Sequence, residues 1–341
     1  MQNIYLKFSF FCCVIFMHTM ASGTSTLDVV KKRKVKVIKC GVSTGLPGFS
    51  APNSKGQWIG MDVDICRAVA AAIFNDPEKV RYVSLSAQQR FTALQSGEVD
   101  ILSRNTTRTL GRDTTIGLNF APVVYYDGQG FMVRKADGIK SAKDLSGASI
   151  CTQQGTTTEL NLSDYFRSHK MKFKPVVFES NDEVTRSFLS KRCDALTTDA
   201  SGLAAERSKL KNPDAYLILP EIISKEPLAP AVRHGDDNWL DIVTWTVYAL
   251  IAAEEFGITS KNIDSFKKTK DPKIQRLLGL IKGNGKALGL PEDWAYNAIK
   301  KVGNYGEIFA RNVGAYSPLK LERGFNGLWN KGGLMYAPPI R

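Results

Sequence analysis

Histidine is scarce in this sequence of 341 residues, which contains only His18, His169 and His234. His18 lies in the apolar segment at the N-terminus, and the other two lie in polar stretches typical of loops. We find no serine or cysteine nucleophile with a base beside it in the pattern that covalent catalysis needs. We therefore expect no catalytic residues and no enzyme activity.

Long apolar runs are missing as well once the first twenty or so residues are passed, so no later segment is expected to span a bilayer. The contents of hydrophobic residues, 43%, and of charged residues, 23%, are typical of a globular protein. No zinc-finger, helix-turn-helix or aromatic RNA-binding pattern is present, so we expect no nucleic-acid partner. The length is sufficient for two domains of ordinary size.

The N-terminal segment has the pattern of a secretory signal peptide. Lys7 precedes an apolar block from Phe8 to Met17, which is followed by the small residues Ala21, Ser22 and Gly23. We predict a signal peptide over residues 1–23, with cleavage after Gly23 or, as the alternative, after Ala21. A retained membrane anchor is less favoured because the block is too short. The mature chain is then expected in the periplasm.

The formal net charge is +13, and much of it lies in the run from Lys31 to Lys39. Such a run is suited to contact with anionic lipid or acidic partners. We interpret it instead as a solvated arm at the start of the mature chain.

Strand and helix patterns alternate through most of the chain, which predicts an α/β fold with mostly parallel sheets. In the first series, Asp62 is the expected N-cap of a helix that ends at Phe74. Asp127-Gly-Gln-Gly130 interrupts the pattern and is interpreted as a first crossing into a second α/β series. The segment 225–230 is the expected return crossing, and helices are expected from Trp239 onward, including one over 291–311. We predict two lobes, 24–128 with 229–341 and 129–228.

The mature chain has four cysteines, and their even number in an exported protein predicts disulfides. Four cysteines allow three pairings. We favour Cys40–Cys66 and Cys151–Cys193 because each of these pairs falls within one predicted lobe. Buried free thiols are the alternative, and the spacings do not resemble a zinc site, so no metal is expected.

Two stretches of the predicted lobes resemble each other. Leu94 to Leu102 and Leu189 to Leu196 each contain the end of a helix and an aspartate at the start of a strand, and a polar cluster follows. If both sheets present the carboxyl ends of their strands to one crevice, that crevice is the expected ligand site.

The polar cluster after the first of these strands suits a small carboxylate. Asn105, Thr106 and Thr107 are followed by Arg112, whose planar guanidinium forms paired hydrogen bonds with carboxylates. A surface loop with a solvated arginine is the alternative.

In the second lobe, Thr156-Thr-Thr-Glu159 predicts a capping box, with Thr156 as N-cap, after a loop with Gly155. The free N–H groups of such a helix start bind anions, although a purely structural cap is equally expected from this motif.

Asp199 follows the second strand, and its carboxylate can accept hydrogen bonds from an ammonium group. The alternative is that it caps the helix over 201–207. A guanidinium, a helix N-terminus and a carboxylate together match the headgroup of a free α-amino acid.

Three segments that carry these residues resemble a known family. They are Arg104-Asn-Thr-Thr, Gln154-Gly-Thr-Thr-Thr-Glu-Leu-Asn and Thr197-Thr-Asp-Ala-Ser-Gly-Leu-Ala. They are similar to the substrate-binding proteins of polar and general L-amino-acid ABC transporters, which are type II periplasmic binding proteins. The resemblance extends over nearly the whole mature chain and implies a bilobal fold with extra C-terminal helices.

The resemblance also implies the roles of site residues. It implies that Arg112 holds the α-carboxylate with help from Asn105, Thr107, Thr156 and Thr157, and that Asp199 takes the α-ammonium. The side-chain pocket is expected at Ser43, Leu46, Ser86 and Gln154. Ser43 and Ala87 replace an aspartate and an aromatic residue of the glutamine-specific branch, which leaves a roomier pocket and favours broad specificity.

We therefore expect an exported binding protein that closes around one L-amino acid by hinge motion near Gly128–Gly130 and Glu226–Leu228. It is expected to deliver this ligand to a membrane-embedded ABC permease, to be a monomer and to need no cofactor. A small-carboxylate dehydratase on the same fold and a sensory ligand-binding protein are the alternatives.

Overall fold

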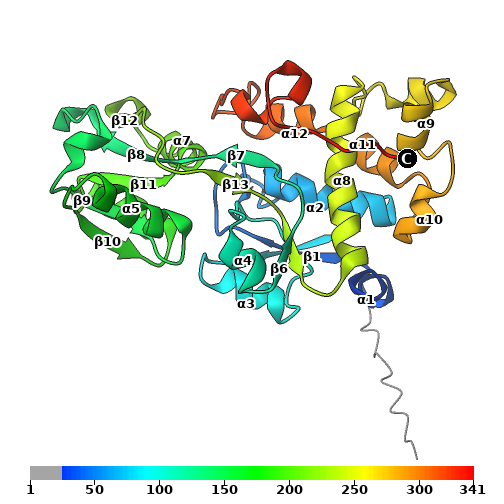
Figure 1. Cartoon of the computed structure of the whole chain (residues 1–341), viewed down its shortest axis with the longest axis horizontal. Helices are drawn as coiled ribbons and strands as arrows, with labels where there is room; N and C mark the ends of the chain where they lie inside the picture. Colours follow the sequence, from blue (N-terminus) through cyan, green and yellow to red (C-terminus); the bar gives the residue numbers. More distant parts are fainter. Residues whose placement is uncertain (1–24) are drawn as a thin grey trace, which may run out of the picture.

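The computed structural model describes residues 25–341, so the predicted signal peptide over residues 1–23 lies outside the described residues. Strands and helices form two α/β lobes that lie side by side and are joined by two neighbouring strands (Figure 1). The predicted bilobal α/β fold is confirmed. Among residues 25–341, the structure contains no helix with the length and apolar character needed to cross a membrane.

Lobe 1 contains a five-stranded sheet in the order β4-β1-β5-β14-β6. The strands are β1 (Ile38–Val42), β4 (Val80–Ser84), β5 (Ile101–Leu102), β6 (Leu118–Phe120) and β14 (Ala231–Arg233). The strands of the first α/β series, β4, β1 and β5, are parallel, whereas β14 is antiparallel to β5 and β6. The sheet is therefore mixed, because β14 enters it from the chain that returns from lobe 2.

The helices of lobe 1 lie on both faces of this sheet. They are α1 (Thr26–Lys32), α2 (Met61–Phe74), α3 (Gln89–Gln95), α4 (Leu110–Thr114), α8 (Asp237–Glu255), α9 (Pro272–Leu277), α10 (Asn284–Leu288), α11 (Trp294–Val302) and α12 (Tyr305–Asn312). Ile38, Cys40 and Val42 of β1 point to the core that α2, α8 and α11 build. A second apolar cluster with α3 covers the opposite face, as the two-residue period of a strand requires.

Lobe 2 repeats this plan with a sheet in the order β10-β9-β11-β8-β12. Its elements are β8 (Gln129–Arg134), β9 (Ser149–Gln153), α5 (Thr157–Ser168), β10 (Lys174–Phe178), α6 (Asn181–Leu189), β11 (Ala195–Asp199), α7 (Ala200–Ser208) and β12 (Tyr216–Ile218). Phe131 and Val133 of β8 join the core under α5, whereas Met132 joins the core under α6 and α7. Both faces of this sheet are therefore buried.

Two crossing strands connect the lobes, β7 (Tyr125–Asp127) and β13 (Glu226–Leu228). They pair with each other in an antiparallel ladder that sets Asp127 opposite Glu226 and Tyr125 opposite Leu228 (Figure 1). Residues 129–218 supply all the strands of the lobe 2 sheet.

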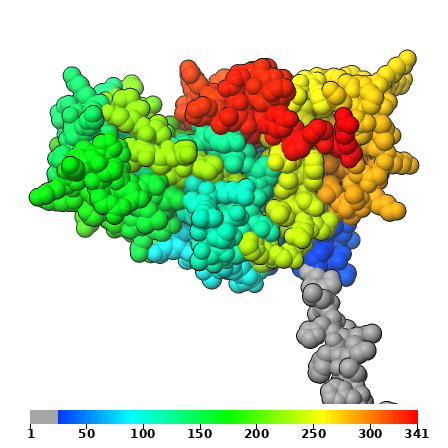
Figure 2. Space-filling model, in the orientation of Figure 1, coloured from blue at the N-terminus to red at the C-terminus, as the bar shows by residue number. Residues whose placement is uncertain are grey.

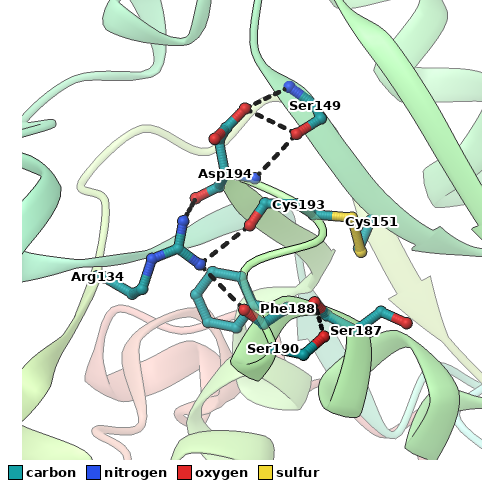
Figure 3. Close-up of a disulfide and its surroundings, with 8 residues drawn as sticks. All are labelled: Arg134, Ser149, Cys151, Ser187, Phe188, Ser190, Cys193 and Asp194. Carbon is teal, nitrogen blue, oxygen red and sulfur yellow. Dashed lines mark hydrogen bonds between the residues drawn. A yellow bond between two sulfur atoms is a disulfide. The ribbon is translucent and has the colours of Figure 1, made fainter.

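The resemblance between the two halves of the sequence has a counterpart in hydrogen bonds. In lobe 1 the Asp100 N–H donates to the Lys39 carbonyl, and the Asp100 carboxylate accepts from the Lys39 N–H at 2.8 Å. In lobe 2 Asp194 makes the same two bonds with Ser149, its carboxylate accepting at 2.7 Å (Figure 3). Each aspartate therefore links the start of one strand to the strand beside it, at equivalent places in the two sheets.

Both favoured cysteine pairs are joined in the structure. Cys40 of β1 is bonded to Cys66 of α2 with the Cα atoms 6.3 Å apart. Cys151 of β9 is bonded to Cys193, just before β11, with the Cα atoms 5.7 Å apart (Figure 3). Each bond joins elements of one lobe.

The basic run near the start of the mature chain is held by the fold and is not a free arm, so that interpretation was wrong in part. α1 buries Leu27 and Val30 in the core of lobe 1, and Lys31 Nζ donates to the Gly289 carbonyl at 2.8 Å. The Arg33 guanidinium lies against the buried Asp100 carboxylate, with Nη2 2.7 Å from Oδ1. Leu27 and Val30, which precede the run, anchor the segment, whereas Lys32, Lys34 and Lys36 are exposed.

Two local predictions in lobe 1 were also wrong. Gly60, not Asp62, is the N-cap of α2, because its φ of 133° is accessible to glycine, and Asp62 lies inside the first turn. The helix expected over 291–311 is divided into α11 and α12. Gly303, with a φ of 96°, ends α11, and Asn304 caps α12 through a capping box with Glu307.

Candidate functional site

Two small adjoining cavities lie between the lobes, next to the carboxyl ends of β5, β9 and β11. In each cavity the volume that the centre of a water molecule can occupy is about 30 Å³. Both are lined by Arg104, Asn105, Gln153, Thr198 and Asp199. The first is completed by Arg90, Thr107, Thr156, Thr157 and Thr158, and the second by Ser43, Leu46, Asn181 and Gly202. The crevice expected from the topology is therefore present.

The lobes touch each other beside the first cavity. The hydroxyl oxygens of Thr107 in lobe 1 and Thr157 in lobe 2 are 3.3 Å apart. Arg90 Nη2 of lobe 1 donates to the Gly155 carbonyl of lobe 2 at 3.5 Å. In the space-filling view, lobe 2 and the cyan part of lobe 1 lie against each other on the face shown (Figure 2). The lobes are thus drawn together in this structure.

Asp199 points an unpaired carboxylate at both cavities. It occupies the N-cap position of α7, but its side chain makes no capping hydrogen bond. No hydrogen bond or ion pair joins this carboxylate to any other residue in 25–341, although Asp199 is only 7% exposed. Burial, followed by the nearby Asp127 and Glu226, raises the pKa of Asp199 well above its usual range. An acceptor of this kind is suited to an ammonium group.

Three buried guanidinium groups of lobe 1 lie at this space or close to it, and two of them, those of Arg90 and Arg104, line it. Arg104 Nε donates to the Leu85 carbonyl at 2.9 Å, and Arg112 Nη1 donates to the Thr107 carbonyl at 2.8 Å. Arg90 makes only 3.5 Å contacts, to Thr106 and Gly155. None of the three forms an ion pair within the described part of the chain, because all these acceptors are uncharged. Buried cations without anionic partners are costly, so the site is suited to an anionic group.

The start of α5 brings backbone donors to the first cavity. The N–H groups of Thr157 and Thr158 have no hydrogen-bond partner among residues 25–341. Thr156 Oγ1 accepts from the Glu159 N–H at 3.3 Å, as predicted, but the Glu159 carboxylate accepts from the Gly155 N–H at 3.1 Å and not from the N-cap itself. The predicted capping box is therefore only half formed. A helix start with free N–H groups attracts a carboxylate.

Glu226 of the crossing strand β13 connects both lobes at the edge of this site. It is completely buried, and its Oε2 accepts from the hydroxyls of Thr107 in lobe 1 and of Thr157 in lobe 2, the latter at 2.9 Å. Its Oε1 accepts from Asn161 at 2.7 Å and from Ser224 at 2.8 Å. The two threonine hydroxyls that were expected to help bind a carboxylate therefore already bind one of the protein's own.

Asp62 supports the loop that carries the lobe 1 residues. Its Oδ2 accepts from the Asn105 N–H at 2.9 Å and its Oδ1 from the Ser103 hydroxyl at 3.3 Å. These bonds hold Asn105 with a φ of +34°, in the left-handed region. Burial raises the pKa of Asp62 to about 7, and the bonds from Asn105 and Ser103 oppose that rise.

Most of the predicted site residues meet at the cavities. Asn105, Thr107, Thr156, Thr157, Asp199, Ser43 and Leu46 line one or both of them. Arg112 lines neither, since its guanidinium lies behind Thr107 and 5.1 Å from the centre of the Phe91 ring. Ser86 lines neither cavity, and its hydroxyl accepts from the Gln89 N–H at the start of α3. Gln154 is exposed at the end of β9.

Sequence reasoning missed several residues of the site, and Arg104, Arg90 and Glu226 are the most informative. Arg104 follows the end of the buried strand β5 by two residues, which places it at the carboxyl edge of the sheet. Glu226 is the one acid in the return crossing, residues 225–230, and is followed only by apolar residues there, a pattern that is visible in the sequence. Arg90 carries no such signal, because an arginine near the start of a helix is ordinary.

Comparisons with known proteins agree with this geometry. The sequence profile described as "Bacterial extracellular solute-binding proteins, family 3" matches residues 38–263. The chain is 58% identical, over 100% of both chains, to the general L-amino acid-binding periplasmic protein AapJ of Rhizobium johnstonii. It is 54% identical to the glutamate/glutamine/aspartate/asparagine-binding protein BztA of Rhodobacter capsulatus, over 94% of this chain and 95% of that protein.

A solved structure is similar as well. It is an ABC-transporter periplasmic binding protein from Brucella ovis with glutathione bound, 57% identical to this chain. The TM-score is 0.91, and the match covers 93% of this chain and 100% of that one. The C-terminal helices beyond residue 263 therefore have counterparts in these relatives, although the family profile ends before them.

Proposed function

Because the chain belongs to family 3 of the bacterial extracellular solute-binding proteins, we propose that it captures free L-amino acids between its lobes and delivers them to an ABC permease in the membrane. It is a binding protein and not an enzyme, in keeping with its relatives at 54–58% identity. The periplasm is its place of action, with residues 1–23 removed as a signal peptide. It works as a monomer, with lobe 1 formed by 24–128 and 229–341 and lobe 2 by 129–228.

The observation that carries this proposal is that an unpaired carboxylate, that of Asp199, and unpaired cations face the same space between the lobes. The Asp199 carboxylate of lobe 2 receives the α-ammonium. The N–H groups at the start of α5 bind the α-carboxylate, in the positive field of Arg112 behind Thr107. A zwitterion placed in this way touches both lobes and therefore favours the closed form by differential affinity. The hinge is formed by β7 and β13 near Gly128–Gly130 and Glu226–Leu228.

Broad specificity fits the second cavity. Ser43 and Leu46 line it with small or flexible side chains, and AapJ is a general L-amino acid-binding protein by name. The cavities in the closed structure are small, so a ligand enters when the lobes separate.

Isothermal titration calorimetry of the mature chain with the protein L-amino acids tests the proposal. The protein is first freed of any carried ligand by denaturation, dialysis and refolding, and the released small molecules are identified by mass spectrometry. We expect submillimolar binding of several L-amino acids and none of their deaminated analogues. Absence of binding across the whole panel, by a refolded protein with native circular dichroism, would contradict it.

A further inference from the structure

Arg104 differs from Arg90 and Arg112, the other two arginines near the site, because it is in contact with both cavities. Arg104 lines both cavities, Arg90 lines only the first, and Arg112 lines neither. The side chain is 4% exposed, and its Nε is held by the Leu85 carbonyl at 2.9 Å. Its two Nη atoms make no hydrogen bond to any other residue in 25–341, and neither is fully enclosed by protein atoms. The guanidinium is thus fixed through its Nε, and its two Nη groups remain available as hydrogen-bond donors.

The two cavities have different chemistry, and this assigns them to different parts of a ligand. The first contains the start of α5, which suits the α-carboxylate. Asp199 lies at the junction, where the α-ammonium is expected. The second continues past Asp199 to Ser43, Leu46 and Asn181. The side chain of an amino acid whose headgroup is bound in this way extends into the second cavity.

Two charged groups line this second cavity, and since Asp199 is assigned to the α-ammonium of the ligand, Arg104 is left without an anionic partner. Arg104 is the one cation that lines it, and no carboxylate of residues 25–341 lies within ion-pair distance of its guanidinium. Asp62, the acid that supports the loop, directs its oxygens to Ser103 and Asn105 instead. Asn181 donates to Glu206, which Lys209 already pairs with at 2.7 Å. A ligand group with two acceptor oxygens supplies what the cavity lacks.

We propose that Arg104 is a specificity-determining residue that binds a second carboxylate, on the side chain of the ligand, so that dicarboxylic amino acids are the preferred class. A side-chain amide binds more weakly because its carbonyl oxygen occupies one of the two Nη donors. An apolar side chain leaves both unpaired. This inference rests on the proposed function, since it assumes that the headgroup binds at α5 and Asp199.

Calorimetry with three ligands of five carbons each tests this role, namely L-glutamate, L-glutamine and L-norvaline. In the unmodified protein we expect glutamate to bind more tightly than norvaline. In Arg104→Met we expect glutamate affinity to fall by ~10- to 150-fold, because charge-assisted bonds are lost. Norvaline affinity stays within about threefold, since no hydrogen bond to this ligand is removed. Arg104→Lys, which keeps the charge without the fork, retains an intermediate preference for glutamate.

Arg108→Met is the matched control. It removes the same charge four residues away, from a side chain that is 49% exposed and pairs with Asp113 outside the cavities. We expect all three affinities to be unchanged in this variant. Equal losses for glutamate and norvaline in Arg104→Met would overturn the inference, because they would place Arg104 at the headgroup. Unchanged glutamate affinity would overturn it too. If none of the amino acids binds even the unmodified chain, the proposed function itself fails.

Discussion

Asp199 shows how a single buried group links ligand binding to protons. Its carboxylate has no hydrogen-bond partner among the described residues and lies near two further acids, Asp127 and Glu226, which together with burial raise its pKa. Arg90 and Arg112 oppose this rise. An ammonium group binds only the ionised form, so below the pKa of Asp199 in the free protein a ligand must displace a proton from its carboxyl group.

Binding is therefore predicted to release protons and to strengthen as the pH rises. Affinity increases until the pH passes the pKa of Asp199 in the free protein, and it then stays constant until the ligand's own ammonium group loses its proton. Calorimetry in buffers of different ionisation enthalpy measures the released protons directly. Asp199→Asn should weaken binding by ~10-fold or more and abolish the proton release. Proton release of equal size in this variant would assign it to another group.

Asp62 gives a second prediction, which concerns stability. Its pKa is raised to about 7 in the folded protein, so between pH 4 and pH 7 the folded chain holds a proton that the unfolded chain has lost. Asp62 therefore makes the protein less stable as the pH rises through this window, by at most roughly 1.4 kcal/mol per pH unit.

Urea unfolding from pH 4 to pH 8 checks this slope. Asp62→Asn removes the titrating group, so the difference in unfolding free energy between the two proteins should change steadily from pH 4 to pH 7 and level off above. A difference that is independent of pH would mean that Asp62 is ionised in the fold throughout.

The residue scale also shows what a sequence can indicate. Asn105, Thr107 and Asp199 could be found because each follows a strand, and strand ends of parallel sheets meet at one edge. Arg104 sits in the same place and was passed over in favour of Arg112, which has the family pattern but lies behind Thr107. The direction in which a long side chain turns depends on its neighbours, here the Leu85 carbonyl and the Phe91 ring, and these come from other segments.

At the scale of elements, the alternation of strands and helices was visible because apolar residues repeat with the right period. α2, α5 and α8 lie within a few residues of their expected positions. Elements whose stability comes from distant contacts were not visible. α1 is an example, since its basic residues dominate the local pattern while Leu27 and Val30 pack on helices that follow 200 residues later. α4, with five residues, is too short to show a period.

The disulfide of lobe 2 provides a prediction at this scale. It fastens β9 to the segment before β11, where the Arg134 guanidinium also donates to the Phe188 and Cys193 carbonyls, each at 3.0 Å (Figure 3). Replacing both cysteines, Cys151→Ser with Cys193→Ser, should lower the unfolding free energy of lobe 2 by roughly 2–4 kcal/mol. Urea denaturation followed by far-ultraviolet circular dichroism measures this loss.

The second disulfide supplies the control for that experiment. Cys40→Ser with Cys66→Ser affects lobe 1, where the bond joins β1 to α2. In the Cys151/Cys193 variant only the Cys40–Cys66 bond remains. Any change in unfolding free energy that a reductant causes in this variant should therefore come from the loss of that bond. An unfolding midpoint equal to that of the unmodified protein would show that the packing of Cys151 and Cys193 suffices without the covalent bond.

At the scale of the whole molecule, Glu226 of the hinge strand β13 is hydrogen-bonded to both lobes. It accepts hydrogen bonds from Thr107, Thr157, Asn161 and Ser224 without any exposure to solvent. Glu226→Ala removes the acceptor that these four donors share, although the Thr107 and Thr157 hydroxyls can still bond to each other across 3.3 Å. Each donor left unsatisfied costs about 1–3 kcal/mol where it stays buried. Opening the lobes lets water satisfy them, so the open form gains relative to the closed one.

Small-angle X-ray scattering of the ligand-free protein measures this shift. We expect a larger radius of gyration for Glu226→Ala than for the unmodified protein, and weaker apparent binding, because less of the protein is in the closed form. Glu206→Ala is the control for the radius of gyration, since Glu206 is an equally buried acid whose partners Asn181, Thr185 and Lys209 all lie in lobe 2. Its ligand affinity is not compared, because Asn181 lines the second cavity. An increase of equal size in both variants would point to partial unfolding and not to hinge opening.

The order of the strands in lobe 1 has a consequence for how the protein is made. β14 lies between β5 and β6, yet it follows all of lobe 2 in the chain. A polypeptide is synthesised from its N-terminus, so all the strands of lobe 2 and both of its cysteines are in the chain while the lobe 1 sheet still has a gap. Lobe 1 remains incomplete until residue 233 and then α8 have been added. Completion of lobe 1 by the last third of the chain is therefore the step that commits this protein to its native state.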